Sequence, residues 1–130
     1  MVAAVTDSAN VGYNAAEIAA RRGGKSMQRV AFTMKLKAGF ETEYQRRHDE
    51  VWPELVRELE AAGVQDYSIF LDPDSLTLFA VQKVKDHNTT ADLPKARIVK
   101  KWWKYMADIM DTNDDNSPIV KNLREVFHMD

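Results

Sequence analysis

Two kinds of hydrophobic periodicity alternate along this chain, and their order restricts the folds that it can adopt. In residues 30–36 every second residue is apolar, which is the period of a half-buried strand. In residues 40–63 apolar residues recur at steps of three and four, which is the period of a helix with one buried face. Pro53 lies inside this segment, so we expect a kink or a restart there, because proline lacks the backbone N–H group that helix propagation needs.

The second half of the chain repeats this alternation. Residues 67–71 and 76–84 are strand-like and flank the turn-forming segment 72–75, so they predict a β-hairpin. After a polar stretch, the apolar positions between Ile98 and Met110 predict a second helix. The tail of residues 119–128, in which residues 123–128 alternate, predicts a last strand.

The order of these elements, βαββαβ, predicts an α+β fold of the ferredoxin-like type, with an antiparallel sheet and both helices on one face. The strands carry apolar residues on both faces, so the second face also requires a cover. A homodimer that packs sheet against sheet provides one. We therefore expect a homodimer on this ground alone.

Length and composition indicate one soluble domain. Within the 130 residues we expect an N-terminal extension of unassigned role at 1–26, rich in small residues, and a domain at 27–130. A net charge of -2 without a basic block argues against nucleic acid as a partner. No apolar run is long enough for a membrane helix or a secretion signal, and there is no cysteine, so we expect a cytoplasmic protein without membrane association.

The sequence offers few groups for catalysis. His48, His87 and His128 lie in separate predicted elements, without the close pairing of metal ligands, so we expect no metal site. The chain contains no glycine-rich phosphate loop or nucleotide-binding fingerprint, so we expect no cofactor. An enzyme of this composition would depend on proton transfer or on positioning.

Tyr44 and His48 are four residues apart, so they project from the same, apolar face of the first predicted helix. One interpretation is a core histidine that is hydrogen-bonded to a carbonyl group. The other is a site for proton transfer, because histidine titrates near neutral pH. The spacing leaves both interpretations open.

Three other aromatic residues also have two interpretations. Trp102 and Trp103 diverge by about 100° on the second helix, so both are core residues or one of them offers a flat platform to a sugar ring. Tyr67 is either an aromatic residue at the sheet edge or a group that binds a hydroxyl. The basic pairs Arg46-Arg47 and Lys100-Lys101 are predicted to lie on solvated helix faces.

Four motifs together resemble the L-rhamnose mutarotase family, over a match from about Gln28 to the C-terminus. They are Glu43-Tyr44-Gln45-Arg46-Arg47-His48, Val51-Trp52-Pro53-Glu54-Leu55, Trp102-Trp103-Lys104-Tyr105-Met106 and Asp115-Asn116-Ser117-Pro118. The resemblance implies a dimeric α/β barrel of ferredoxin-like subunits. It also implies an isomerase that interconverts the α and β anomers of L-rhamnose without metal or cofactor. By the same resemblance His48 corresponds to the proton donor, and Tyr44, Tyr67, Trp102 and Trp103 correspond to substrate-binding residues.

Such a reaction needs one acid and one base, so that the pyranose ring opens and recloses on its other face. We expect His48 to act as the acid at the ring oxygen, with Tyr44, a water molecule or a carboxylate as the base. Two alternatives remain open on the same dimeric barrel: a cofactor-independent monooxygenase and a non-catalytic small-molecule binder. The sequence leaves open which related aldose is preferred.

Overall fold

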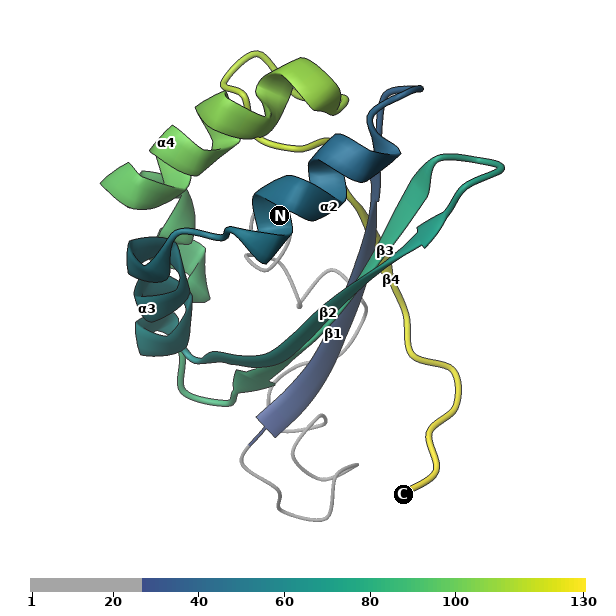
Figure 1. Ribbon diagram of the computed structural model, residues 1–130. Helices are drawn as coiled ribbons and strands as arrows, with labels where there is room; N and C mark the ends of the chain where they lie inside the picture. The colour runs from purple at the N-terminus through teal and green to yellow at the C-terminus, as the bar shows by residue number, and fades with distance from the viewer. Residues whose placement is uncertain (1–26) are drawn as a thin grey trace.

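A computed structural model describes residues 27–130, which form a four-stranded antiparallel sheet with helices across one face (Figure 1). The strands are β1 (Met27–Lys35), β2 (Val64–Asp72), β3 (Thr77–Lys85) and β4 (Lys121–Leu123). The helices are α2 (Glu41–Asp49), α3 (Pro53–Ala62) and α4 (Arg97–Met106), with the 3-10 helices η2 (Thr90–Lys95) and η3 (Ala107–Ile109). The predicted extension, residues 1–26, lies outside the described residues.

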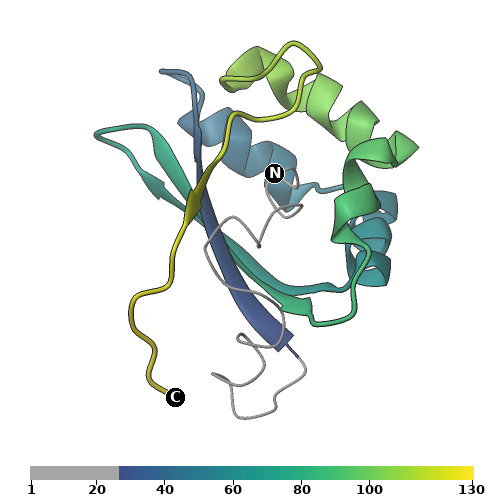
Figure 2. The same cartoon turned by 180° about the vertical axis from the view of Figure 1, so that it is seen from behind.

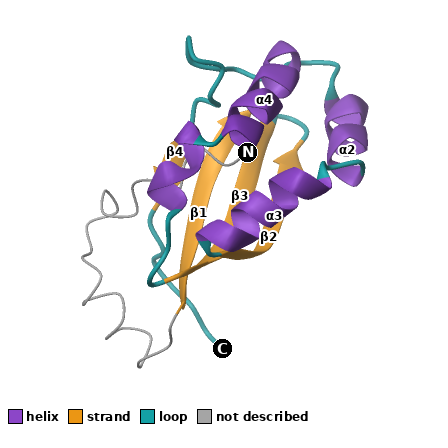
Figure 3. Ribbon diagram, turned by 90° about the vertical axis from the view of Figure 1, so that its left-hand side faces the viewer, coloured by secondary structure: helices purple, strands orange, loops and turns teal. Residues whose placement is uncertain are grey.

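The strand order in the sheet is β2-β3-β1-β4, so β3 lies between the two strands that flank the first helical segment. Because β1 and β2 are both antiparallel to β3, they run parallel to each other. Helices α2, α3 and α4 lie across the same face of this sheet (Figure 3). The three predicted strands of residues 30–84 are confirmed. Within the described part of the chain, no helix has the length and apolar character that crossing a membrane requires.

The face of the sheet under the helices forms the core. Phe32 and Met34 of β1 pair with Ala80 and Leu78 of β3, and all four side chains are buried. The small Ala80 beside Phe32 leaves room for the helical side chains that pack on this part of the sheet. The helical side chains that pack on this face include Leu55, Leu59, Val99, Trp102 and Met106.

Pro53 divides the first predicted helix into two, as its position predicted. Helix α2 ends at Asp49 and α3 begins at Pro53, where the missing N–H group would have no helical partner in any case. Gly63 caps the C-terminal end of helix α3, and its φ of 106° is left-handed. A β-carbon added at Gly63 would approach the β-carbon of Asn88 to 2.9 Å. Both the left-handed φ and the lack of space for a side chain therefore favour glycine here.

The predicted last strand is wrong in its extent. Strand β4 covers only Lys121–Leu123 and pairs with residues 31–33 of β1. Residues 124–130 form no strand and run away from the sheet (Figure 2). Val126 and Phe127 are 80% and 78% exposed, so the alternation has no buried face on this segment. Alternation predicts a strand only where a neighbour provides both hydrogen-bonding partners and a surface to bury against.

The opposite face of the sheet has no covering helix among residues 27–130 (Figures 1 and 3). Phe70 of β2 pairs with Phe79 of β3 on this face, and their side chains are 65% and 40% exposed. Ala31 and Val81, paired across β1 and β3, lie on the same face and are half-buried. We call these four residues the open face. Its apolar character agrees with the expectation that the strands carry apolar residues on both faces.

Candidate active site

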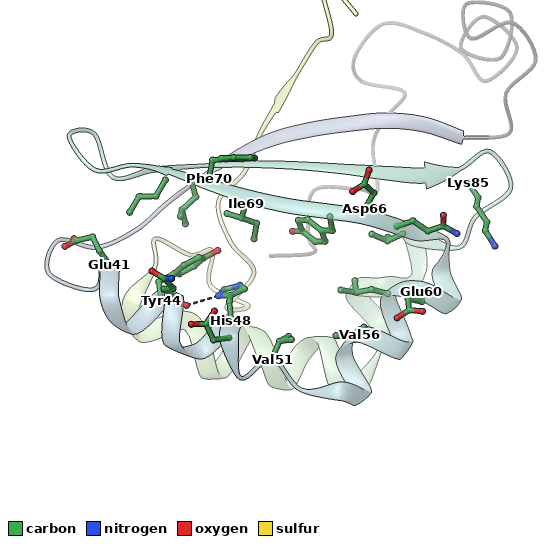
Figure 4. Close-up of a pocket in the computed structure, with 18 residues that line it drawn as sticks. Glu41, Tyr44, His48, Val51, Val56, Glu60, Asp66, Ile69, Phe70 and Lys85 are labelled. Atoms are coloured by element: carbon green, nitrogen blue, oxygen red, sulfur yellow. Dashed lines mark hydrogen bonds between the residues drawn. The ribbon is translucent and has the colours of Figure 1, made fainter. Parts of the chain in front are cut away.

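A pocket of about 1070 Å³ lies between helices α2 and α3 and strand β2 (Figure 4). Tyr44 and His48 reach it from α2, Val51 and Val56 line it between and within the helices, and Tyr67 lines it from β2. In Figure 4 the labelled side chains of Tyr44 and His48 point from their helix toward the strand. Three of the five predicted site residues, Tyr44, His48 and Tyr67, therefore line one pocket.

Helix α2 fixes the orientation of the His48 ring. The Nδ1 atom lies 2.9 Å from the carbonyl oxygen of Tyr44, one turn earlier, and the two rings stack with their centroids 4.2 Å apart. A carbonyl oxygen can only accept, so Nδ1 donates its hydrogen to it. In the neutral ring Nε2 then carries the lone pair. This atom is buried and has no hydrogen-bond partner among the described residues.

Burial keeps this group of residues uncharged at neutral pH. Burial lowers the pKa of His48 to about 4, although the hydrogen bond to the Tyr44 carbonyl opposes that shift. Burial also raises the pKa of the Tyr44 phenol and that of the Tyr67 phenol. At pH 7 the pocket therefore holds a neutral imidazole with a free lone pair beside two phenols that keep their hydrogens. The imidazole can accept a proton, and the phenols can donate hydrogen bonds.

A β-bulge directs Tyr67 into the site. The register between β2 and β3 shifts between Gln65 and Ser68, and Asp66 within this bulge has a φ of 48°. Bulges re-aim side chains and concentrate near functional sites. Here the bulge brings the Tyr67 ring onto the core face, where it meets Phe32 edge-on at 6.5 Å. The left-handed conformation of Asp66 costs a small backbone strain, and the placement of Tyr67 in the site explains why the fold accepts it.

The two tryptophans lie deeper than the tyrosines. Trp102 is fully buried and Trp103 is 3% exposed, both on α4. Trp102 meets the His48 ring edge-on at 5.4 Å, and it packs in the same way against Trp52 at 5.0 Å. The structure thus brings Trp102 into contact with His48, whereas Trp103 shares only the core. Whether a sugar stacks on either ring remains a prediction.

Several buried polar atoms have no hydrogen-bond partner among the described residues, some of them in the pocket and others in the core. Among residues 27–130 they belong to six side chains, from α2, α4 and the core face of the sheet: Tyr44, His48, Gln82, Trp102, Trp103 and Asn122. Buried polar groups in folded proteins nearly always have partners, so such atoms require an explanation. Two of the six, Tyr44 and His48, line the pocket, where a ligand with hydroxyl groups offers them both donors and acceptors.

Gln82 and Asn122 are two members of this set that the sequence interpretation missed. In β3 the residues of the core face are Leu78, Ala80, Gln82 and Val84, so Gln82 is the one polar residue in a buried series. A polar residue at a buried position of the alternating strand was the sequence signal that could have identified Gln82. Asn122 belongs to β4, opposite Phe32, and the correct register of this short strand could not be read from its sequence.

The prediction that Arg46 and Arg47 share a solvated face is wrong for Arg47, whose side chain is only 9% exposed. Its guanidinium donates to Glu43 on its own helix at 2.7 Å and to both carboxylate oxygens of Asp108 in η3, at 2.9 and 3.2 Å. It also donates to the Tyr105 carbonyl at 2.7 Å. Arg47 therefore joins the helix that carries His48 to the end of α4, and these partners explain its burial.

Comparison with known proteins identifies close relatives. The family model for L-rhamnose mutarotase matches residues 29–129. An L-rhamnose mutarotase of Flavobacterium johnsoniae is 53% identical over 102 residues, which cover 78% of this chain and 95% of the relative. One from Phocaeicola vulgatus is 55% identical over 104 residues, which cover 80% of this chain and all of the relative.

Solved structures agree with these relationships. The crystal structure of an L-rhamnose mutarotase from Formosa agariphila is 51% identical and superposes with a TM-score of 0.74 over 79% of this chain and 99% of the other. A conserved protein from Methanosarcina mazei has a TM-score of 0.51 at 13% identity, over 76% of this chain and 92% of the other. This second likeness concerns the fold alone.

Proposed function

Because the chain belongs to the L-rhamnose mutarotase family, we propose that it interconverts the α and β anomers of L-rhamnopyranose in the pocket between α2, α3 and β2. The protein is then an isomerase of the aldose 1-epimerase type. The observation that carries this proposal is the pairing, in one pocket, of an imidazole with a free Nε2 lone pair and two protonated phenols. The relatives do not favour the alternatives of a monooxygenase or a non-catalytic binder.

Mutarotation requires two proton movements. The O–H bond of the anomeric hydroxyl breaks, its electrons form the aldehyde, and the electrons of the ring C–O bond pass to the ring oxygen, which takes up a proton. We assign the first movement to Nε2 of His48, which accepts the proton. The phenol of Tyr44 or Tyr67 supplies the other hydrogen. Reclosure on the opposite face reverses both transfers and restores the resting protonation states.

This assignment refines the donor role that the resemblance implies for His48. A histidine with a pKa near 4 is neutral at pH 7, so it has to accept a proton before it can donate one. His48 is then the base in ring opening and the acid in ring closure. Tyr44 and Tyr67 bind hydroxyl groups through their phenols, and Trp102 and Trp103 offer their indole N–H groups and ring faces to the sugar.

Saturation-transfer NMR on a panel of aldoses tests the function directly. We expect the protein to speed the exchange between the α and β signals of L-rhamnose without changing their equilibrium ratio. L-fucose and other aldoses in the same panel define the preference for the sugar. Sugar binding without faster exchange would indicate a binder, and oxygen consumption with an aromatic substrate would indicate a monooxygenase. Either result would overturn the proposal.

The same family membership supports a homodimer of ferredoxin-like subunits, closed as a dimeric α/β barrel, with the open face as its interface. The apolar open face of Ala31, Phe70, Phe79 and Val81 supports this arrangement, because a second copy would remove it from water. Sedimentation at micromolar concentration should give a dimer, and Phe79→Lys should give a monomer. The control Lys100→Gln, an exposed residue of α4 on the other side of the sheet, should remain dimeric. A monomeric wild-type protein with full activity would contradict the proposal.

We further propose that residues 27–130 are the mutarotase domain, with the L-rhamnose sugar as its small-molecule partner, and that the reaction takes place in the cytoplasm. The family match begins at residue 29, which supports a catalytic unit separate from the N-terminal 26 residues. The absence of cysteine means that the fold needs no disulfide, which suits a reducing compartment. Removal of residues 2–26 should leave anomer exchange unchanged.

A further inference from the structure

The lining of the pocket combines polar and apolar side chains. Helix α2 contributes polar side chains to it, among them Gln45 and Asp49, which are exposed. Other lining side chains are apolar and only half-buried: Val51, Val56, Ile69 and Leu71. Because they line the pocket and keep part of their surface accessible, a ligand in the pocket can contact them. A lining of this kind suits a ligand that carries hydroxyl groups and an apolar group together.

Two of these apolar side chains lie beside the groups assigned to proton transfer. The backbone N–H of Val51 donates to the carbonyl oxygen of His48 at 3.1 Å, so Val51 directly follows the helical turn that carries the imidazole. Ile69 pairs with Ala80 on the core face of the sheet and follows Tyr67 by two residues. In Figure 4 the side chains of Val51 and Ile69 point into the pocket from opposite walls, near His48.

The covalent structure of the sugar determines which of its groups lies next to the reacting atoms. In L-rhamnopyranose the ring oxygen joins the anomeric carbon to C5, and C5 carries the methyl group. The methyl group is therefore only two bonds away from the ring oxygen that takes up a proton. We propose that Val51 and Ile69 bind this methyl group and are specificity-determining residues that select 6-deoxy sugars. This inference rests on the mutarotase function proposed above.

Three sugars that differ only at C5 test the inference on the wild-type protein. L-rhamnose carries a methyl group there, L-lyxose a hydrogen and L-mannose a hydroxymethyl group. We expect kcat/KM for anomer exchange, measured by NMR above the uncatalysed rate, to be about tenfold or more lower for L-lyxose, because an apolar pocket loses a carbon. L-mannose should also be poorer than L-rhamnose, because its added hydroxyl loses water without gaining a partner. Equal kcat/KM values for the three sugars would overturn the inference.

Val51→Thr and Ile69→Thr test whether these two residues cause the preference. Threonine has the shape of valine but carries a hydroxyl in place of one methyl group. In each variant the ratio of kcat/KM between L-rhamnose and L-lyxose should fall by about threefold or more, because the sugar methyl loses an apolar contact. The ratio between L-mannose and L-rhamnose should rise, because the new hydroxyl can pair with that of L-mannose. A merely structural role would lower kcat/KM for all three sugars alike, and unchanged ratios would overturn the inference.

A matched control makes the same substitution elsewhere in the pocket. Val56 of α3 also lines it, and in Figure 4 it lies farther from His48 than Val51 does. Val56→Thr should therefore keep the wild-type ratios. Changed ratios in Val56→Thr alone would place the methyl group elsewhere and overturn the inference. If threonine at Val51 or Ile69 prevents folding, Val51→Ala and Ile69→Val remove only apolar atoms and should lower the ratio between L-rhamnose and L-lyxose in the same direction.

The same measurements separate this inference from the proposed function. The exchange rate of the wild type on L-rhamnose tests the function alone, and the ratios between sugars test Val51 and Ile69 alone. Without catalysed exchange on any of the three sugars the proposed function fails, and the inference fails with it. With catalysed exchange but unchanged ratios in the variants, the function stands and only Val51 and Ile69 lose their role.

Discussion

The Nδ1 atom of His48 lies 2.9 Å from the carbonyl oxygen of Tyr44, so the backbone of α2 itself determines which ring nitrogen is available to a substrate. A carbonyl cannot donate, which leaves Nε2 with the lone pair in the neutral ring. The partner is one helical turn away on the same helix. The tautomer therefore depends on a local contact and is maintained as long as the helix is.

The pH dependence of the rate distinguishes the two roles of His48. A base must be unprotonated in the free enzyme, so kcat/KM for anomer exchange should be level at neutral pH and fall on acidification, with a limb near pH 4. An exposed histidine would give this limb near 6.5. Exchange rates by NMR between pH 3.5 and 8 measure it. A rate that increases as His48 becomes protonated would assign the acid role to the resting enzyme.

Replacing His48 by glutamine should separate the rate from the fold. The glutamine side chain has a similar volume and can keep a hydrogen bond to the Tyr44 carbonyl, but it cannot transfer a proton at neutral pH. Anomer exchange should fall by at least about 100-fold, as is usual for a general acid or base. Sugar binding, followed by ligand-observed NMR, should persist. Wild-type exchange rates in a folded His48→Gln protein would make His48 a purely structural residue.

The same histidine should make the protein less stable in acid. Its folded pKa of about 4 lies below the value of about 6.5 in the unfolded chain, so the unfolded chain binds the proton first as the pH falls. Stability from the neutral, buried ring is complete above pH 6.5 and is lost on approach to pH 4, by about 3 kcal/mol. Urea unfolding at pH 7 and pH 4 should show a smaller loss in His48→Gln. Equal losses in both proteins would contradict the burial of this ring.

The indole N–H groups should report on the sugar. The Nε1 atoms of Trp102 and Trp103 have no partner within residues 27–130, so L-rhamnose should change the intrinsic fluorescence. Replacement by phenylalanine removes the N–H group and keeps a ring, so it should raise KM several-fold at whichever position binds the sugar. Trp52→Phe serves as the control and should keep the fluorescence change. Unmoved fluorescence with unaltered kinetics would place both indoles in the core only.

Adjacent arginines on α2 should differ sharply in their contribution to stability. Arg47→Gln breaks the partly buried contacts to Asp108 and to the Tyr105 carbonyl, so we expect a loss of about 1–3 kcal/mol in the free energy of unfolding. Arg46→Gln breaks exposed pairs with Glu43 and Glu50, and it should change little. Urea denaturation of both variants measures the difference. Equal losses would show that the contacts of Arg47 contribute no more than those of an exposed ion pair.

Local patterns predicted those parts of the fold that local chemistry determines. The alternation in β1 and β3 and the restart at Pro53 depend on neighbouring residues in the sequence, and both are observed. Residues 124–128 alternate equally well but do not pair with a strand. Whether a partner strand lies beside a segment depends on the tertiary structure, which local alternation does not reveal. Arg47 is similar, because its burial depends on Asp108, which is 61 residues away.

The site divides in the same way. The spacing of four residues between Tyr44 and His48 placed both on one helix face, and the structure brings them into one pocket. The free nitrogen of His48 could not be inferred, because it depends on ring orientation. Gln82 was visible only as a parity anomaly in an apolar strand, and its significance requires knowledge of the hydrogen-bonding geometry around it.

The bulge in β2 also affects how the protein behaves when it is concentrated. β2 is the outer strand of the sheet on its side, and a regular outer strand exposes a row of backbone donors and acceptors to which strands of other molecules can add. The irregularity between Gln65 and Ser68 breaks that row, and the charge of Asp66 lies within it. Edge-to-edge polymerisation into fibres is thereby disfavoured, so a feature that aims Tyr67 into the pocket also protects the protein from aggregation.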